Sequence, residues 1–118
     1  MVQSNAVMVG WNRAVSGREP QAAEVFAHAV NFFDKLKTSA KIESYEPVFL
    51  GYHGGDLNGF FLVKGTHAQL EAMRASDEFV DLTVRAGHTL EQVGVIEAYT
   101  GPEIPNVMGR WTKLIPQR

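Results

Sequence analysis

The chain has 118 residues, of which 45% are hydrophobic, and its formal net charge is −2. This length and apolar content suit one domain with a buried core and argue against a disordered chain. The chain contains no cysteine, which excludes disulfides, thiolate metal sites and cysteine nucleophiles. It also suits a cytoplasmic protein, which we expect here. Because the charges are interspersed, we expect no nucleic-acid partner; we also expect no signal peptide and no membrane contact.

The first third of the chain predicts a strand followed by a helix. Residues 6–13 are mostly apolar and predict the first strand, which a Ser-Gly-Arg-Glu-Pro segment then breaks. From residue 21 to residue 39, apolar side chains recur at intervals of three and four, which is typical of an amphipathic helix. These side chains are Ala22, Val25, Phe26, Ala29, Phe33 and Leu36.

The next segment predicts a β-hairpin. Residues 43–52 indicate a second strand, and Pro47 within it favours an edge position or a bulge, because proline lacks the backbone N–H donor. The sequence His-Gly-Gly-Asp-Leu-Asn-Gly at residues 53–59 is rich in turn-forming residues. It leads directly into an apolar third strand at residues 60–63.

A capped helical region follows the hairpin. Thr66 and Gln69 have the spacing of a capping box, after which we expect a helix with Leu70 and Met73 facing inward. Ser76 is a second N-cap candidate and predicts a break in the helix just before it.

The last predicted elements complete the fold. A second helical segment should carry Phe79, Val80, Thr83 and Val84. Gly87 should end or weaken it, and residues 92–100 predict the last strand. The order is therefore β-α-β-β-α-β, which indicates a single α+β domain of ferredoxin-like type spanning residues 1–118, with its core at about residues 5–100. In this architecture the helices lie on one face of an antiparallel sheet.

Both faces of the predicted sheet are apolar. In the second strand, Val48 and Leu50 point to one face and Phe49 points to the other, and the third and fourth strands show the same two-sided pattern. The helices can cover only one of these faces. We therefore predict a homodimer through the sheet face, with the alternative that the C-terminal tail covers it.

The tail, residues 101–118, is too apolar for a disordered end. Its apolar residues are Ile104, Val107, Met108, Trp111, Leu114 and Ile115. Prolines at positions 102, 105 and 116 argue against a long regular helix. We therefore predict an extended or irregular segment that packs on the domain or on the partner subunit and buries Trp111.

Several segments resemble a known superfamily. The βαββαβ order, the short first strand and the sequence Ser-Asp-Glu-Phe at residues 76–79 are similar to the dimeric α/β-barrel superfamily, which includes antibiotic-biosynthesis-monooxygenase-like proteins. Residues 17–19, 42–46 and 53–60 (His-Gly-Gly-Asp-Leu-Asn-Gly-Phe) resemble more closely a set of small bacterial proteins of unknown function. The superfamily contains cofactor-free monooxygenases, haem-degrading enzymes, isomerases, decarboxylases and proteins without known activity. The resemblance therefore implies a fold and no single activity.

The same resemblance raises the question of haem. Haem-degrading members use an asparagine on the first strand, a tryptophan, and a histidine on the second helix. Asn12 and His88 approximate two of these positions, whereas neither Trp11 nor Trp111 stands at the third. We therefore expect no haem and no other cofactor, and we keep a haem-degrading monooxygenase only as an alternative.

Four polar residues are candidates for a site between the sheet and the helices: Asn12, His53, Glu97 and Tyr99. His53 could act as a base or a ligand, and the competing interpretation is that it builds the turn with its neighbours. Glu97 stands in an otherwise apolar strand and could act as an acid or base if buried, with Tyr99 on the same face. The competing interpretation of Glu97 is a rim carboxylate paired with Arg13 or Arg110.

The remaining histidines predict no metal site. His28 lies opposite the apolar stripe of the first helix, and His67 lies in the first turn of the second, so we expect both to be exposed. No two histidines have the spacing His-x-x-x-His.

Two functional hypotheses remain open. The first is a protein that binds a small molecule, or acts on one without a cofactor, in a pocket between sheet and helices. The second is a non-catalytic homodimeric module whose apolar second face serves assembly alone. The sequence names neither a substrate nor a reaction, and it leaves open whether the protein is an enzyme.

Overall fold

The computed structural model describes residues 2–116. Its elements are β1 (Ala6–Trp11), α1 (Glu19–Thr38), β2 (Ser44–Phe49), β3 (Gly59–Lys64), α2 (His67–Ala75), α3 (Asp77–Thr89), β4 (Gly94–Ala98) and α4 (Glu103–Lys113). The α+β class and the βαββαβ order are confirmed, with the second helical region divided into α2 and α3 and with one further helix after β4. Within residues 2–116, no helix is long and apolar enough to cross a membrane.

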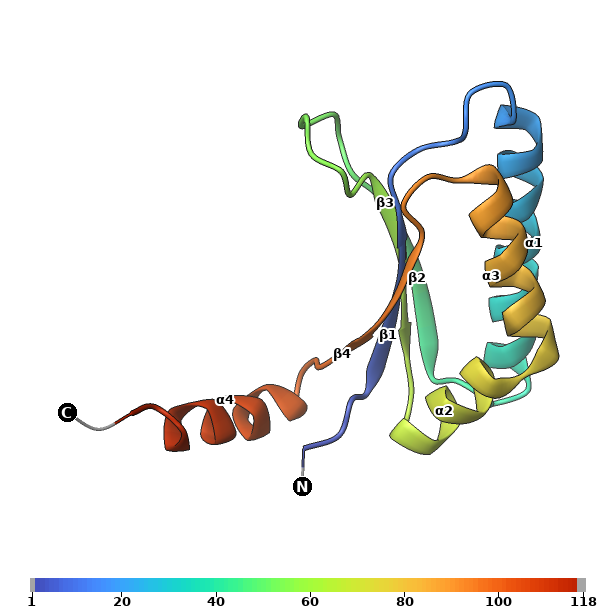
Figure 1. Cartoon of the computed structure of the whole chain (residues 1–118). Coiled ribbons are helices and arrows are strands. Elements are labelled where there is room, and N and C mark those ends of the chain that lie inside the picture. Colours follow the sequence, from blue (N-terminus) through green and yellow to red (C-terminus); the bar gives the residue numbers. More distant parts are fainter. Residues whose placement is uncertain (1, 117–118) are drawn as a thin grey trace.

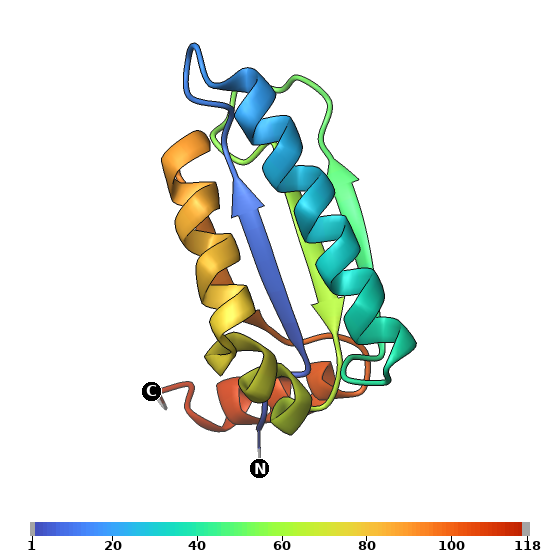
Figure 2. The same ribbon diagram turned by 90° about the vertical axis from the view of Figure 1, so that its right-hand side faces the viewer.

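The four strands form one antiparallel sheet in the order β2-β3-β1-β4. The helices α1, α2 and α3 lie together on one face of this sheet (Figures 1 and 2). Pro47 is on the edge strand β2, as predicted, where a missing backbone donor costs least.

The core lies between the sheet and these three helices. Alternate residues of the two central strands, such as Val7 in β1 and Val63 in β3, are fully covered by the helices. Leu70 and Met73 of α2 face inward as predicted. The larger core residues from α1 and α3 are Phe32, Phe33, Phe79 and Leu82.

The break between α2 and α3 is confirmed at Ser76. Its hydroxyl accepts a hydrogen bond from the backbone N–H of Phe79 (3.2 Å), which caps α3, and donates one to the carbonyl of Met73 (2.6 Å), which ends α2. The capping box at the start of α2, formed by Thr66 and Gln69, is also present. These side-chain bonds satisfy backbone groups that the helix ends leave without partners.

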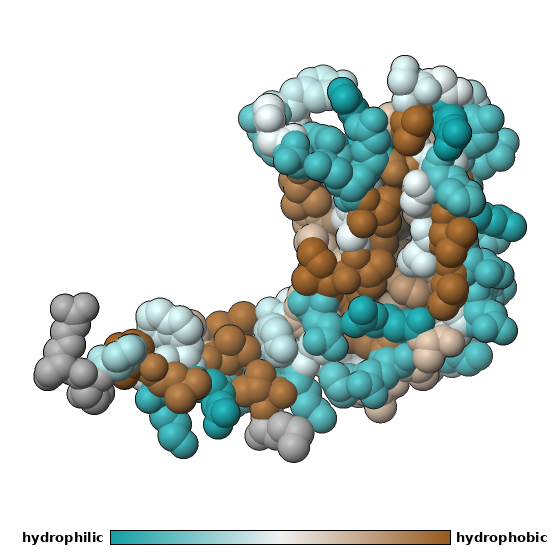
Figure 3. All heavy atoms as spheres, viewed as in Figure 1, coloured by the Kyte–Doolittle hydropathy of each residue, from teal (hydrophilic) through white to brown (hydrophobic). Residues whose placement is uncertain are grey.

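The opposite face of the sheet is apolar and, among residues 2–116, no helix packs on it (Figure 1). We call it the outer face; its larger apolar residues are Met8, Val48, Phe60, Leu62 and Ile96. The charged residues Glu46 and Lys64 lie on the same face, in β2 and β3. Met8 on the central strand β1 pairs with Leu62 on one side and with Ile96 on the other, so the apolar side chains are contiguous. The space-filling view shows apolar surface on the side of the sheet toward which α4 projects (Figure 3).

The prediction of an extended or irregular tail is wrong, because residues 103–113 form the helix α4. Pro102 is the N-cap and Pro105 lies in the first turn, where backbone N–H groups have no partner within the helix, so neither proline interrupts it. Trp111 is not buried against its own domain, since 63% of it is exposed.

Candidate functional site

An apolar cavity of about 300 Å³ lies between the sheet and the helices, at the C-terminal end of β1. Its walls come from β1, β2 and β3, from α1, and from the end of α3 with the segment after it. The lining residues are Val9, Trp11, Ala22, Ala23, Val25, Phe26, Phe49, Phe61, Ala86, Leu90 and Val93. None of them carries a charge, so the cavity itself offers no acid or base.

Four aromatic rings form one wall of this cavity. Phe26 of α1 stacks on Phe61 of β3 with ring centroids 5.2 Å apart, and its ring lies 5.1 Å from that of Phe49 at the end of β2. Trp11 meets Phe26 edge-to-face at 6.2 Å. Aromatic pairs prefer offset and edge-to-face contacts of this kind, and another flat ring placed against this wall could make the same contacts.

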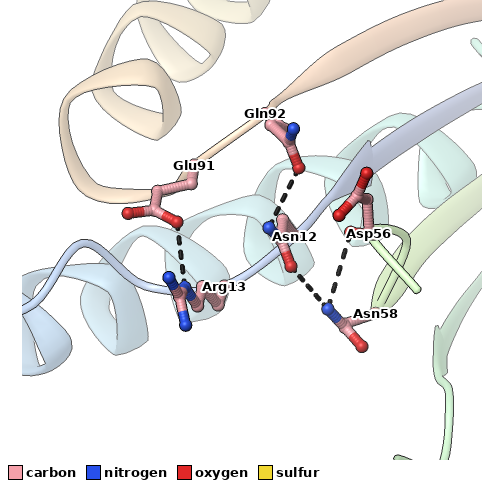
Figure 4. A network of polar contacts seen from close by, with 6 residues as sticks. All are labelled: Asn12, Arg13, Asp56, Asn58, Glu91 and Gln92. Atoms are coloured by element: carbon pink, nitrogen blue, oxygen red, sulfur yellow. Dashed lines mark hydrogen bonds and ion pairs between the residues drawn. The ribbon is translucent and has the colours of Figure 1, made fainter. Parts of the chain in front are cut away.

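A polar network borders the cavity beyond Trp11 (Figure 4). The side-chain amide of Asn12 donates to Oε1 of Gln92 (2.9 Å), and its Oδ1 accepts from the amide of Asn58 (2.6 Å). Arg13, next in the chain, forms an ion pair with Glu91 at 2.9 Å, which raises the pKa of the guanidinium above its ordinary value. The network therefore ties the end of β1 to the β2–β3 loop and to the segment before β4.

A second, more polar hollow lies on the other side of Trp11 and Phe49, the two residues that it shares with the apolar cavity. It is lined by the loop between β2 and β3 and by the end of β1, including Asn12, His53 and Asn58. A ligand in the apolar cavity could therefore extend a polar end toward Asn12 and Asn58. Asn12 retains one N–H and one lone pair for such a contact.

His53 is engaged by its own turn. One ring nitrogen, Nδ1, accepts from the backbone N–H of Gly55 (3.1 Å), and Nε2 lies 2.7 Å from the carbonyl of Leu57. This pattern fits a neutral ring that donates through Nε2. A role as a base would require the loop to give up one of these bonds.

Glu97 and Tyr99 do not line the apolar cavity. Glu97 stands opposite Val7 in the β1–β4 ladder, toward α2, and its carboxylate lies 3.7 Å from Nη1 of Arg74. Neither partner considered from the sequence is correct, because α2 supplies the arginine. Tyr99 follows the end of β4 at the same end of the sheet and is partly exposed.

The histidines lie apart from one another. His28 and His88 line a shallow groove between α1 and α3, on the far side of the helices from Asn12, so Asn12 and His88 do not share a cavity as the haem alternative requires. His67 is half-buried rather than exposed, because it contacts Ser4 and pairs with Glu71 at 3.0 Å. Among residues 2–116, no three histidine, aspartate or glutamate side chains are placed to hold a metal ion.

Asn12 and His53, two candidates from the sequence, line the same polar hollow, whereas the aromatic wall beside them is not predicted from the sequence. Trp11, Phe26, Phe49 and Phe61 come from four different elements, and in the sequence each is one apolar residue of an amphipathic pattern. The exposure of Phe49 (68%) at the end of an edge strand is a property of the fold, and no sequence signal distinguishes it from a core phenylalanine.

Solved structures with the same fold include proteins of unknown function and an oxygenase. A dimeric protein of unknown function with a ferredoxin-like fold from Bacteroides fragilis has a TM-score of 0.58 at 11% identity, over 85% of this chain and 100% of that chain. A dimeric ferredoxin-like protein of unknown function from Thermobifida fusca has a TM-score of 0.60 at 11% identity, over 83% and 92%. SnoaB, a cofactor-independent oxygenase from Streptomyces nogalater, has a TM-score of 0.51 at 16% identity, over 84% and 97%.

These likenesses confirm the predicted ferredoxin-like fold. No family model and no curated protein sequence matches the chain.

Proposed function

We propose that this protein binds a small, uncharged, ring-containing molecule in the apolar cavity between the sheet and the helices. The observation that carries the proposal is the wall formed by Trp11, Phe26, Phe49 and Phe61 around a space of about 300 Å³ without a charged lining residue. Bringing a charged ligand into such a space would cost its hydration without compensation, whereas a flat apolar ring would gain both burial and ring contacts.

The polar end of the ligand would lie toward Asn12. Its amide is held in place by Gln92 and Asn58, so it is preorganised to bind a carbonyl or hydroxyl group beside Trp11. His53 borders the same hollow and is a second candidate for this contact. The likeness to a cofactor-independent oxygenase is compatible with chemistry on such a ligand, and the proposal made for this chain is the binding step.

Calorimetric titration with 2-naphthol, a neutral two-ring probe with one hydroxyl group, tests the site. We expect saturable binding of one molecule per chain. Ala23 lines the cavity but is exposed on α1, so Ala23→Leu should fill the cavity without disturbing the core and should weaken binding by about tenfold or more. Ala27→Leu is the matched control, because Ala27 is an exposed residue of the same helix outside the cavity.

Two results would reject the site. One is the absence of binding of 2-naphthol. The other is equal affinity of the two alanine variants, which would place the probe elsewhere on the protein. In either case the alternative, a non-catalytic homodimeric module, would be favoured, because the apolar outer face would then be the feature that requires a function.

We further propose that two copies of the chain assemble through the outer face. Contiguous apolar residues around Met8 are without a covering helix among residues 2–116, and two solved structures of this fold are described as dimeric. Sedimentation of Ile96→Lys tests this, since Ile96 is 51% exposed and its change should disrupt the dimer while leaving the core intact. Val80→Lys is the control, because Val80 is 47% exposed on α3, behind the sheet; equal effects of both variants would contradict the proposal.

A further inference from the structure

The helix α4 presents a continuous apolar stripe to solvent. Ile104, Met108 and Trp111 follow one another at intervals of four and three residues, and between 46% and 63% of each is exposed. This spacing places the three side chains on one side of the helix. The polar residues Glu103, Asn106, Arg110 and Lys113 lie on the remaining surface.

The domain covers this helix only in part, at Glu103 and Val107, which are partly buried. No residue of α4 is buried. A hydrogen bond from the backbone N–H of Gln3 to Glu103 (3.3 Å) joins only its first turn to the N-terminal segment. A helix of 11 residues is marginal in water on its own, and its stability in proteins comes chiefly from packing of its apolar face. A stable α4 therefore requires a surface to cover the stripe.

The position of α4 indicates which surface that is. A turn at Gly101, with a φ of +51°, and Pro102 directs the helix away from the sheet on the side of the outer face (Figure 1). A second copy seated on the outer face would therefore lie beside α4. By two-fold symmetry, the partner's α4 would lie beside the first copy in the same way.

We propose that α4 is an arm that crosses to the second copy and packs its Ile104–Met108–Trp111 stripe against it. This inference rests on the proposed homodimer, since it assigns a second contact to that assembly. A membrane surface is a weaker candidate, because the polar side of α4 carries one acidic and two basic residues rather than a predominantly basic face. A second copy also explains why the arm and the outer face, two uncovered apolar surfaces, lie on the same side of the molecule.

Tryptophan fluorescence can test the arm, because the chain has only two tryptophans. In Trp11→Phe, Trp111 is the sole reporter. We expect the blue-shifted emission of a buried indole where the protein is a dimer. The emission should shift to that of an exposed indole on dilution, in parallel with dissociation followed by sedimentation. The double variant Trp11→Phe with Ile96→Lys, expected to be monomeric, should show exposed emission at every concentration.

Three outcomes would overturn the arm. A dimer with exposed Trp111 emission would place α4 outside the interface while leaving the homodimer intact. A monomer with buried emission would show that α4 folds back on its own chain. A shift that appears only when vesicles of anionic phospholipid are added would assign the stripe to a membrane. Binding of 2-naphthol is measured separately, so failure of the arm and failure of the cavity are distinguishable.

A second pair of variants keeps the test independent of Trp11. Trp111→Ser should weaken dimer affinity by about tenfold or more, since it removes the largest side chain of the stripe. Asn106→Ser is the control, because Asn106 contacts Glu103 on the polar side of α4. Both positions are exposed in the single chain, so neither substitution should unfold the domain. Equal dimer affinities of the two variants would contradict the arm.

Discussion

The indole ring of Trp11 occupies the space that a side chain at Gly59 would fill. The two residues stand opposite each other in the β1–β3 ladder, and a Cβ atom at position 59 would lie 2.6 Å from Cζ2 and 2.8 Å from Cε2 of the indole. Gly59 has an ordinary backbone conformation, so glycine is required here for its lack of volume. The bare backbone of β3 lets the indole lie across the sheet and form one side of the aromatic wall.

Gly59→Ala should therefore destabilise the protein and move Trp11. We expect the free energy of unfolding to fall by about 1–3 kcal/mol, as for other overpacked sites. In a Trp111→Phe background, the emission of Trp11 should change as well. Gly87→Ala is the control, because a Cβ atom there meets nothing within 4 Å and alanine favours the helix. Urea unfolding measures the stability of the two variants, and fluorescence measures the emission of Trp11. If Gly59→Ala has wild-type stability and unchanged Trp11 emission, the steric role of Gly59 is contradicted.

Gly59 also illustrates what can be predicted from the sequence. The glycines of residues 53–59 indicate a turn because turn propensity is local, and the hairpin is confirmed. The steric role of Gly59 depends on Trp11, which is distant in the sequence and is brought opposite it only by the register of β1 and β3. Periodicity and capping patterns predict the helices and strands for the same reason as the glycines predict the turn, because they involve residues only a few positions apart.

The errors of prediction have the same origin. As a rim carboxylate, Glu97 is expected from the sequence to pair with Arg13 or Arg110, but its partner is Arg74 of α2, which no local pattern identifies. The prolines of the tail predict a break in any helix, but Pro105 falls within the first turn of α4, where proline is tolerated. Whether a proline is tolerated or breaks a helix depends on the exact residue at which the helix starts. Sequence patterns locate helix ends less well than the helices themselves.

Two non-glycine residues with positive φ should respond differently to glycine. Ala40 (φ +57°) follows the end of α1, and Gln92 (φ +56°) precedes β4. Ala40→Gly should raise the free energy of unfolding by about 0.5–1 kcal/mol, because glycine adopts this conformation without strain. Gln92→Gly relieves the same backbone strain but removes the side chain that accepts the hydrogen bond from the Asn12 amide. The free energy of unfolding should therefore rise less than in Ala40→Gly, or not at all. An equal gain in both variants on urea unfolding would show that the Asn12–Gln92 bond contributes nothing.

Ser76 joins two helices through one hydroxyl group. Ser76→Ala removes the cap of α3 and should lower the free energy of unfolding by about 1 kcal/mol. Ser76→Asp should retain most of the stability, since its carboxylate can accept from the N–H of Phe79. As a control, Thr83→Ala removes a hydroxyl from inside the same helix, where it bonds only the carbonyl of Val80, and should be close to neutral. If both alanine variants unfold at the same urea concentration, Ser76 is not a stabilising cap.

The contact between Tyr45 and Asp34 predicts a dependence of stability on alkaline pH. The phenol hydroxyl donates to Oδ1 of Asp34 at 2.6 Å. This hydrogen bond, followed by partial burial and the negative charge of the carboxylate, raises the pKa of Tyr45 from 10.0 to about 12. Because the folded state holds the proton more tightly than the unfolded state, the contact contributes fully below pH 10, and its contribution is lost as the pH rises toward 12.

Urea unfolding at a series of pH values from 9 to 12 measures this loss. The range is set by the two pKa values of Tyr45, about 10 in the unfolded chain and about 12 in the folded protein. Tyr45→Phe has no phenol proton to lose, so its stability should fall less steeply than that of the wild type over this interval. Tyr52→Phe removes a phenol from a fully exposed position and should follow the wild-type curve, which separates the Tyr45–Asp34 contact from the general ionisation of tyrosines and lysines. If Tyr45→Phe falls as steeply as the wild type, the hydrogen bond does not hold the proton in the folded protein, and the alkaline loss of stability must come from other groups.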